Sequence, residues 1–194
     1  MPSHIGNVHG PAGSSRSGGA TPGPQGGVGA IAILGHGGGR LGITTFDVFD
    51  LPRRRLPETS GIRVAERAYG PELDLPRLAA LLQVGAMPAH AVIQQPSPRA
   101  NQAAPRIFAC GQAYGAVLGV LATLRIAATP VYGAVWQRDM GIAAGADAIL
   151  ARAGELFPDQ VSKWRRTRDV SRAYAALLAE WGRRQRLGRG LTTR

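Results

Sequence analysis

The chain has 194 residues, a formal net charge of +11 and a sequence pI near 11.4. This length allows one domain with a sizeable core and a terminal extension. The charge predicts an anionic partner, with nucleic acid ahead of a membrane surface because we find no strongly amphipathic basic helix. The single cysteine excludes a disulfide framework and a thiolate metal site, and the four histidines have no zinc-ligand spacing. With no signal-peptide pattern and no membrane-spanning apolar run, we expect a cytoplasmic protein.

The N-terminal part is irregular until a hairpin begins. Residues 1–27 are dominated by Gly, Pro and Ser, so we expect a flexible tail, because this composition cannot offset the entropy lost on ordering. The apolar run GAIAIL at 29–34, the turn GHGGGR at 35–40 and the alternating segment LGITTFDVFDLP at 41–52 predict a hairpin. We disfavour a phosphate-binding loop at these glycines, because no Lys-Ser/Thr pair follows at the required spacing.

The middle of the chain alternates helices and strands. The segment LPRLAALLQV at 75–84 has helical periodicity, with Asp74 as its N-cap. The short apolar segment HAVIQQ at 90–95 predicts a buried strand. A glycine-containing helix begins near residue 107, and a further strand is expected at 129–135. Strand, helix and strand together predict a crossover unit with parallel pairing.

The helix after residue 107 carries Gly111, Gly115 and Gly119, which a four-residue spacing places on one face. Each glycine in a helix interior costs roughly 1 kcal/mol relative to alanine. We therefore expect this face to lie very close to another backbone, in a tightly packed core helix.

Two helices and a basic loop close the chain. Helices are predicted at 147–156 and 170–186, with a basic loop at 163–168 between them, and the apolar stripe of the last helix turns Tyr174 toward a sheet. Ten Lys or Arg residues lie between 161 and 194, against two acidic residues. Phosphate contacts give affinity without sequence readout; a solvated helix face with a basic tail is the alternative. The candidate DNA-binding residues are Lys163, Arg165, Arg166, Arg168 and Arg172.

A hairpin followed by alternating strands and helices and by a closing helix is the ribonuclease H-like order. Seven segments in this order carry a resemblance: GAIAIL at 29–34, VFDLP at 48–52, AVIQQ at 91–95, FACGQAYGAVLGVL at 108–121, VYGAVWQRDMG at 131–141, ARAGELFPD at 151–159 and RDVSRAYAALLAEWGRR at 168–184. Over about residues 21–186 the chain resembles the RuvC-type Holliday-junction resolvases, in particular their short phage and prophage forms. The resemblance implies an α/β fold with a mixed sheet flanked by helices, in which the first strand is weak or missing here. It also implies a domain at 28–186 and a basic tail at 187–194.

The resemblance further implies metal-assisted hydrolysis of a phosphodiester, in which acidic side chains hold two Mg²⁺ ions. It implies DNA as the partner, as a four-way junction or a duplex, and a two-fold homodimer with the glycine-containing helix or its neighbour at the interface. The family's acidic positions fall on Thr21, Gln94 and Tyr174, and a competing register places His36 at the first of them. Asp169 is the one acid near an expected place and the one candidate metal ligand. One carboxylate cannot hold two magnesium ions, so we expect impaired or lost hydrolysis.

Three hypotheses follow from these residues. The favoured one is a RuvC-like protein that binds DNA around a degenerate acidic site, with Asp169 as a residual ligand or simply an N-cap. The second is an active Mg-dependent endonuclease whose acids are Asp47, Asp50 and Asp169, which requires three carboxylates within about 5 Å of a shared point. The third is a non-catalytic interaction protein or a decayed prophage product. Where the family often has lysine after the tryptophan, this sequence has Gln137.

Overall fold

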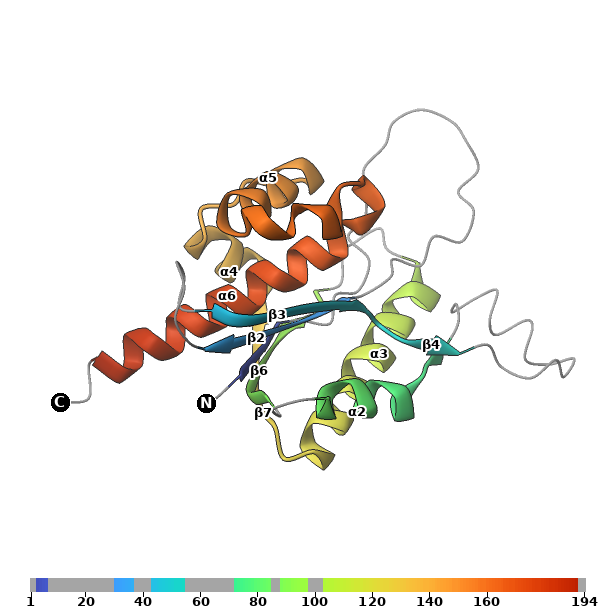
Figure 1. Cartoon of the computed structure of the whole chain (residues 1–194). Coiled ribbons are helices and arrows are strands. Elements are labelled where there is room, and N and C mark those ends of the chain that lie inside the picture. Colours follow the sequence, from blue (N-terminus) through green and yellow to red (C-terminus); the bar gives the residue numbers. More distant parts are fainter. Residues whose placement is uncertain are drawn as a thin grey trace, which may run out of the picture.

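A five-stranded mixed sheet organises the computed structural model, which describes residues 3–6, 30–36, 43–54, 72–84, 88–97 and 103–191 (Figure 1). The strand order is β3-β2-β1-β6-β7. The hairpin strands β2 and β3 and the strand β1 are antiparallel neighbours, whereas β1, β6 and β7 run parallel. This confirms the predicted mixed α/β sheet. The bounds are β1 (Ser3–Gly6), β2 (Ala30–His36), β3 (Ile43–Asp50), β6 (Pro88–Gln95) and β7 (Ala127–Tyr132), with a separate two-stranded sheet of β4 (Arg53–Arg54) and β5 (Glu72–Leu73).

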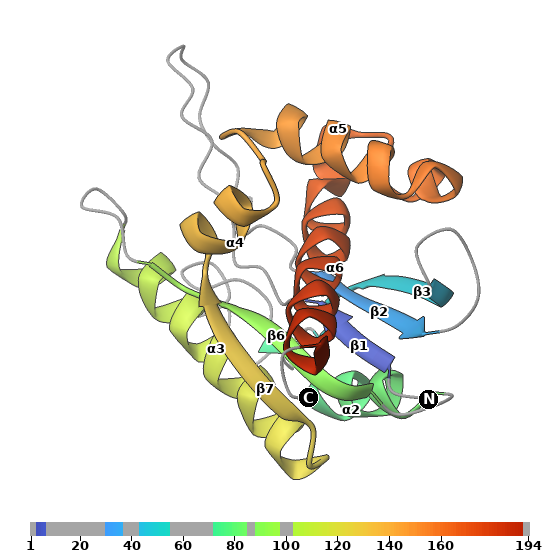
Figure 2. The same cartoon turned by 90° about the vertical axis from the view of Figure 1, so that its left-hand side faces the viewer.

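Helices cover both faces of the sheet (Figures 1 and 2). One face carries α2 (Leu75–Gln83) and α3 (Ala104–Thr123). The other carries α6 (Val170–Leu191), with α4 (Gly133–Asp139), α5 (Ala146–Leu156) and the 3-10 turns η1 (Pro158–Trp164) and η2 (Thr167–Asp169) around it. None of the described helices is long and apolar enough to span a membrane.

Strand alternation divides the buried side chains into two cores. In β6, Ala91 and Ile93 belong to the core beneath α2 and α3, whereas Val92 belongs to the core beneath α6. The next residue on the α6 side of β6 is therefore Gln94. A polar residue at this register position lies against the long C-terminal helix.

The central strand β1 lies where the sequence predicted a flexible tail. Ser3–Gly6 pairs with β2 on one side and with β6 on the other, so the prediction for residues 1–27 is wrong at these four residues; residues 7–29 lie outside the described ranges. A first strand is thus present. The segment Ser-His-Ile-Gly has one large apolar residue. It forms a strand because it pairs with strands on both sides, rather than because of intrinsic propensity.

Other element boundaries follow the sequence with local differences. The predicted hairpin is β2 and β3, and its turn at 37–40 lies outside the described residues. Asp74 caps α2 as expected, since its Oδ1 accepts a hydrogen bond from the backbone N of Arg77 at 3.0 Å. The strand predicted to reach residue 135 ends at Tyr132, because α4 begins at Gly133. The helix α6 continues to Leu191, so the predicted basic tail at 187–194 begins as helix.

The glycine face of α3 differs from the prediction. The helix packs on the sheet through Val117 and Leu121, which are buried. Gly111, Gly115 and Gly119 are exposed on another face, and a Cβ added to any of them meets no atom within 4 Å. The predicted close backbone contact is therefore wrong within the described chain, and this face of α3 is open.

Candidate functional site

Four side chains meet where the parallel strands β6 and β7 end. Gln94 is the second-last residue of β6, and Tyr174 lies near the beginning of α6. The two side chains meet at this place. β7 is followed directly by α4, and this short helix adds Trp136 and Gln137. Gln94 and Tyr174, two of the positions that the resemblance assigned to acids, are therefore in contact.

The four side chains form one neutral hydrogen-bonded cluster. The Tyr174 hydroxyl donates to Oε1 of Gln94, and Trp136 Nε1 donates to the same oxygen at 3.2 Å. Gln137 Nε2 donates to the Tyr174 hydroxyl oxygen at 2.7 Å. The Tyr174 and Trp136 rings stand edge to face, with centroids 4.6 Å apart and planes at 88°. Amide, phenol and indole groups are uncharged near pH 7, so the cluster carries no formal charge.

The cluster is closely packed and mostly buried. Trp136 is fully buried, Tyr174 is 6 % exposed, and the two glutamines are half-buried. Gly133, the first residue of α4, lies over them: a Cβ added there would sit 3.3 Å from both Gln94 Oε1 and the Tyr174 hydroxyl. Glycine at this position thus permits α4 to approach the cluster.

These residues do not fit the two-Mg²⁺ site that the resemblance implies. Magnesium prefers anionic oxygen ligands in octahedral geometry, and this cluster offers neutral oxygens that already accept hydrogen bonds. In the described ranges, no three His, Cys, Asp or Glu side chains are grouped so that they could hold a metal ion. No chemical step through a metal follows from this arrangement.

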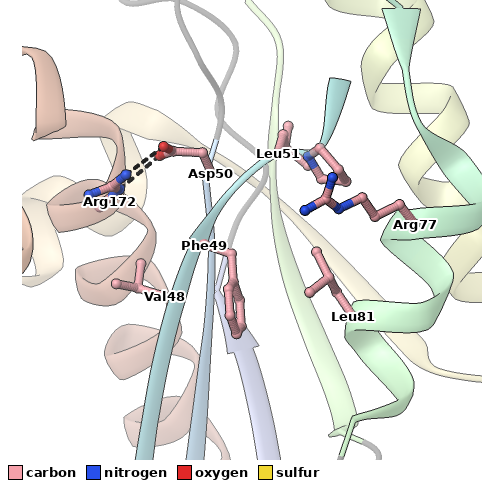
Figure 3. A pocket seen from close by; sticks show the side chains of 8 residues that line it. Val48, Phe49, Asp50, Leu51, Arg77, Leu81 and Arg172 are labelled. Atoms are coloured by element: carbon pink, nitrogen blue, oxygen red, sulfur yellow. Dashed lines mark hydrogen bonds and ion pairs between the residues drawn. The ribbon is translucent and has the colours of Figure 1, made fainter. Parts of the chain in front are cut away.

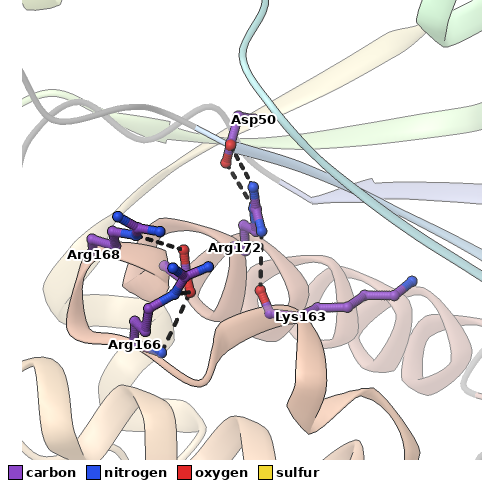
Figure 4. Close-up of polar contacts among 6 residues, drawn as sticks. Asp50, Lys163, Arg166, Arg168 and Arg172 are labelled. Atoms are coloured by element: carbon purple, nitrogen blue, oxygen red, sulfur yellow. Dashed lines mark hydrogen bonds and ion pairs between the residues drawn. The ribbon is translucent and has the colours of Figure 1, made fainter.

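Asp169 is the last residue of η2, directly before α6, and it contacts Arg166 and Arg168, which Figure 4 labels. Its Oδ2 accepts hydrogen bonds from the backbone N and the Nε of Arg166, both at 3.4 Å, and its Oδ1 is 4.0 Å from Nε of Arg168. The side chain is 12 % exposed. These contacts place Asp169 at the third residue of η2, where it accepts from the backbone of the N-cap Arg166, whereas the sequence predicted it as the N-cap of the closing helix. Its role as a metal ligand stays a prediction.

Asp50 forms an ion pair with Arg172 that ties the edge of the sheet to α6 (Figure 4). Arg172 donates from Nε and Nη2 to the two carboxylate oxygens at 2.8 and 2.5 Å, and from Nη1 to the Lys163 carbonyl at 3.3 Å. The hydrogen bond to Asp50 raises the pKa of Arg172 above its usual value. Asp47 is exposed, and strand alternation places it on the opposite face of β3 from Asp50.

Comparison with known proteins gives the fold. No protein-family model and no curated protein matches the sequence. The structure of Thermus thermophilus RuvC matches with a TM-score of 0.52 at 13 % identity, covering 94 % of this chain and 96 % of that one. T. thermophilus RuvC in complex with a Holliday junction substrate matches with a TM-score of 0.53 at 10 % identity, covering 95 % and 96 %. The fold is RuvC-like. Identity this low shows the fold alone, so function must be argued from the site residues.

On this RuvC-like fold, the five candidate DNA-binding residues divide into two groups. Arg165 and Arg166 are exposed between η1 and η2, and Arg168 is exposed on η2; we call these three residues the basic turn. Lys163 instead donates from Nζ to the Phe46 carbonyl at 3.2 Å and lies 5.1 Å from the centroid of the Phe46 ring. Lys163 thus connects η1 to β3, as Arg172 connects α6 to β3. Three of the five cations are therefore exposed, and two of them, Arg166 and Arg168, lie beside the Asp169 carboxylate.

The first position that the resemblance assigned to an acid stays a prediction. Thr21 was assigned to the end of the first strand, but that strand ends at Gly6, and Thr21 lies outside the described residues. His36 is the last residue of β2 and pairs in register with Ile43. Sequence reasoning also missed the contributions of Trp136 and Gly133, although both lie in the segment VYGAVW that carried the resemblance.

Proposed function

We propose that this chain is a RuvC-like DNA-binding protein of the phage or prophage kind, which holds branched or duplex DNA and has lost metal-dependent hydrolysis. The observation that carries the proposal is the neutral pair of Gln94 and Tyr174 at the end of β6. A fold neighbour, T. thermophilus RuvC, has been solved with a Holliday junction substrate, which supports DNA as the ligand class.

The loss of hydrolysis follows from charge. Two Mg²⁺ ions need several carboxylates to offset their desolvation and to bind the attacking water and the leaving oxygen. Gln94 keeps the shape of an acid but not its charge, and its Oε1 already accepts hydrogen bonds from Tyr174 and Trp136. The protein is therefore a pseudoenzyme in this proposal.

The competing endonuclease hypothesis lacks a shared site for its acids. Asp50 is paired with Arg172, and Asp169 is held by Arg166. Asp47 lies on the other face of β3 from Asp50. The ion pairs of Asp50 and Asp169 favour structural roles for these two carboxylates, so we do not propose the three acids as a metal site.

DNA binding rests on the basic turn. Arg166 and Arg168 have side chains 65 % and 69 % exposed, and the Asp169 carboxylate that contacts both is largely buried beneath them. Arginine presents a planar fork of donors that suits phosphate oxygens. The turn immediately precedes α6, and Tyr174 lies five residues after Asp169. A phosphate backbone on the basic turn would thus pass close to the former acidic site.

The open face of α3 supports a homodimer in this proposal. Phe108 is 60 % exposed there, beside three glycines that leave room for a second backbone. Two copies of this face packed together would remove Phe108 from water and explain glycines that otherwise weaken the helix. A two-fold dimer also matches the two-fold symmetry of a four-way junction.

The test of DNA binding is a salt titration with a labelled four-way junction and a matched duplex. Wild-type affinity should fall as salt rises, because phosphate contacts release counterions. Substituting Arg165, Arg166 and Arg168 together by alanine should weaken binding by roughly tenfold or more. The negative slope of log K against log salt should become shallower by up to about three.

A matched control removes the same charge elsewhere. The triple variant with Arg54, Arg77 and Arg125 changed to alanine also loses three exposed arginines, and its affinity and salt slope should change less. Equal losses in the two triple variants would show that net charge alone drives binding. Salt-independent binding would rule out phosphate contacts as the basis of affinity, and absence of binding would remove DNA as the partner.

A further inference from the structure

The free edge of the sheet carries a groove that the DNA-binding proposal does not use (Figure 3). β3 is the first strand in the sheet order, so in the described part of the chain no strand pairs with its outer side. A groove of about 370 Å³ follows its last residues and the two residues after them. Its walls are Arg77 and Leu81 of α2 on one side and Arg172 of α6 on the other.

The floor of the groove is the backbone of β3 and of the two residues after it, of which Pro52 has no N–H and has a carbonyl that already accepts from the Asp74 backbone N at 2.9 Å. In an antiparallel pair, alternate residues direct their N–H and C=O groups to the partner strand, and the residues between direct theirs outward. β3 uses one of these sets for β2. The other set is presented along the outer edge, which is the template for a further strand.

The α2 side of the groove combines apolar surface with one cation. Phe49 and Leu81 provide the apolar part, and the Arg77 guanidinium points between α2 and β3 toward the groove (Figure 3). Arg77 is exposed, and no described acidic side chain forms an ion pair with its guanidinium. This side can therefore take one carboxylate next to an apolar side chain.

The α6 side has a different character. Arg172 is already bound by both oxygens of Asp50, and the Asp50 side chain is 44 % exposed. The Asp50–Arg172 ion pair has a net charge near zero, and its carboxylate is accessible. A polyanion such as nucleic acid would meet this carboxylate along the groove, whereas a strand with one acidic side chain directed to Arg77 avoids it.

We propose that this groove binds an extended acidic peptide segment of a partner protein, which adds to the sheet as a strand beside β3. Successive side chains of the added strand point to opposite sides of the sheet. One acidic side chain meets Arg77, an apolar side chain two residues away lies against Phe49 and Leu81, and the residue between them is small or polar and faces the Asp50–Arg172 pair. The inference is independent of the DNA-binding proposal.

The experiment uses the full chain and a phage-displayed library of random nine-residue peptides. Selected peptides should alternate apolar and polar residues around one Asp or Glu. As synthetic peptides, they should bind the Arg77→Glu variant at least about tenfold more weakly, because a charge-assisted contact is replaced by repulsion. The Arg125→Glu variant, altered at an exposed arginine outside the groove, should bind them as the wild type does.

Backbone methylation separates strand addition from a side-chain contact alone. N-methyl groups at alternate positions of a selected peptide should abolish binding in one register and leave it nearly unchanged in the other, because only one edge of the added strand faces β3. An unlabelled four-way junction should not displace the peptide.

Three results would overturn the proposal. They are a library that yields no peptide sensitive to Arg77→Glu, equal effects of N-methylation in both registers, and displacement of the peptide by DNA in competition for Arg77. The last result would assign the groove to nucleic acid. Since Arg77→Glu changes an exposed position on α2, folding of the variant is checked by its unfolding midpoint.

Discussion

The Tyr174→Phe variant tests whether the neutral cluster stabilises the fold. The hydroxyl donates to Gln94 and accepts from Gln137, and the variant loses both hydrogen bonds. The ring remains, so its edge-to-face contact with Trp136 is kept and no large cavity forms. The change therefore isolates the hydrogen bonds of one atom.

The expected loss is about 1–2 kcal/mol in the free energy of unfolding. A hydrogen bond contributes about 1 kcal/mol net, and an unsatisfied buried group costs more. Two features limit the loss: Gln94 Oε1 still accepts from Trp136, and Gln137 is half-buried and can turn toward water. For a chain of this size the midpoint of thermal unfolding should fall by roughly 2–8 °C.

Urea unfolding followed by circular dichroism measures the difference, with Tyr132→Phe as the matched control. Tyr132 is 50 % exposed, so its hydroxyl should contribute within about 0.5 kcal/mol of zero. An unchanged free energy of unfolding in Tyr174→Phe would refute the structural role of the cluster, as would an equal effect of Tyr132→Phe.

Three further substitutions test other parts of the fold. Gly182→Ala should destabilise by about 1–3 kcal/mol in urea unfolding, because the new Cβ would overlap Cγ2 of Val92; adding Val92→Ala should recover part of the loss. Arg172→Lys should cost about 1 kcal/mol or less, since lysine cannot bind Asp50 through two nitrogens and both side chains of the pair are partly exposed. Gly115→Ala should stabilise the monomer by up to about 1 kcal/mol and weaken the proposed dimer in sedimentation equilibrium; unchanged sedimentation would argue against this interface.

Much of the fold could be predicted because its signals are local. The α2 helix has an N-cap at Asp74 and an apolar period, and the β2–β3 hairpin has alternating strands around a glycine-rich turn. β1 could not be predicted, because four residues with one large apolar side chain carry no propensity signal. This segment forms a strand because it pairs with β2 and β6. The open face of α3 was missed for a related reason: glycine spacing indicates a close approach but does not say whether the neighbour belongs to the same chain.

The candidate site was predicted in part. The place of Gln94 and Tyr174 followed from the family resemblance, and the structure brings them into hydrogen-bonding contact. The acceptor shared with Trp136 was not predictable, because it depends on how α4 begins at Gly133. Likewise, the sequence named Arg172 as a DNA-binding candidate, and only the tertiary structure shows that its guanidinium binds Asp50 on β3.

The most direct test of the central claim is cleavage of a labelled four-way junction, assayed at low salt with and without Mg²⁺ or Mn²⁺. We expect the junction to be bound with or without metal and to remain intact, because no group of carboxylates in the described structure can hold the ions. Metal-dependent cleavage that is lost in Asp50→Asn or Asp169→Asn would contradict the account and would return catalysis to these acids.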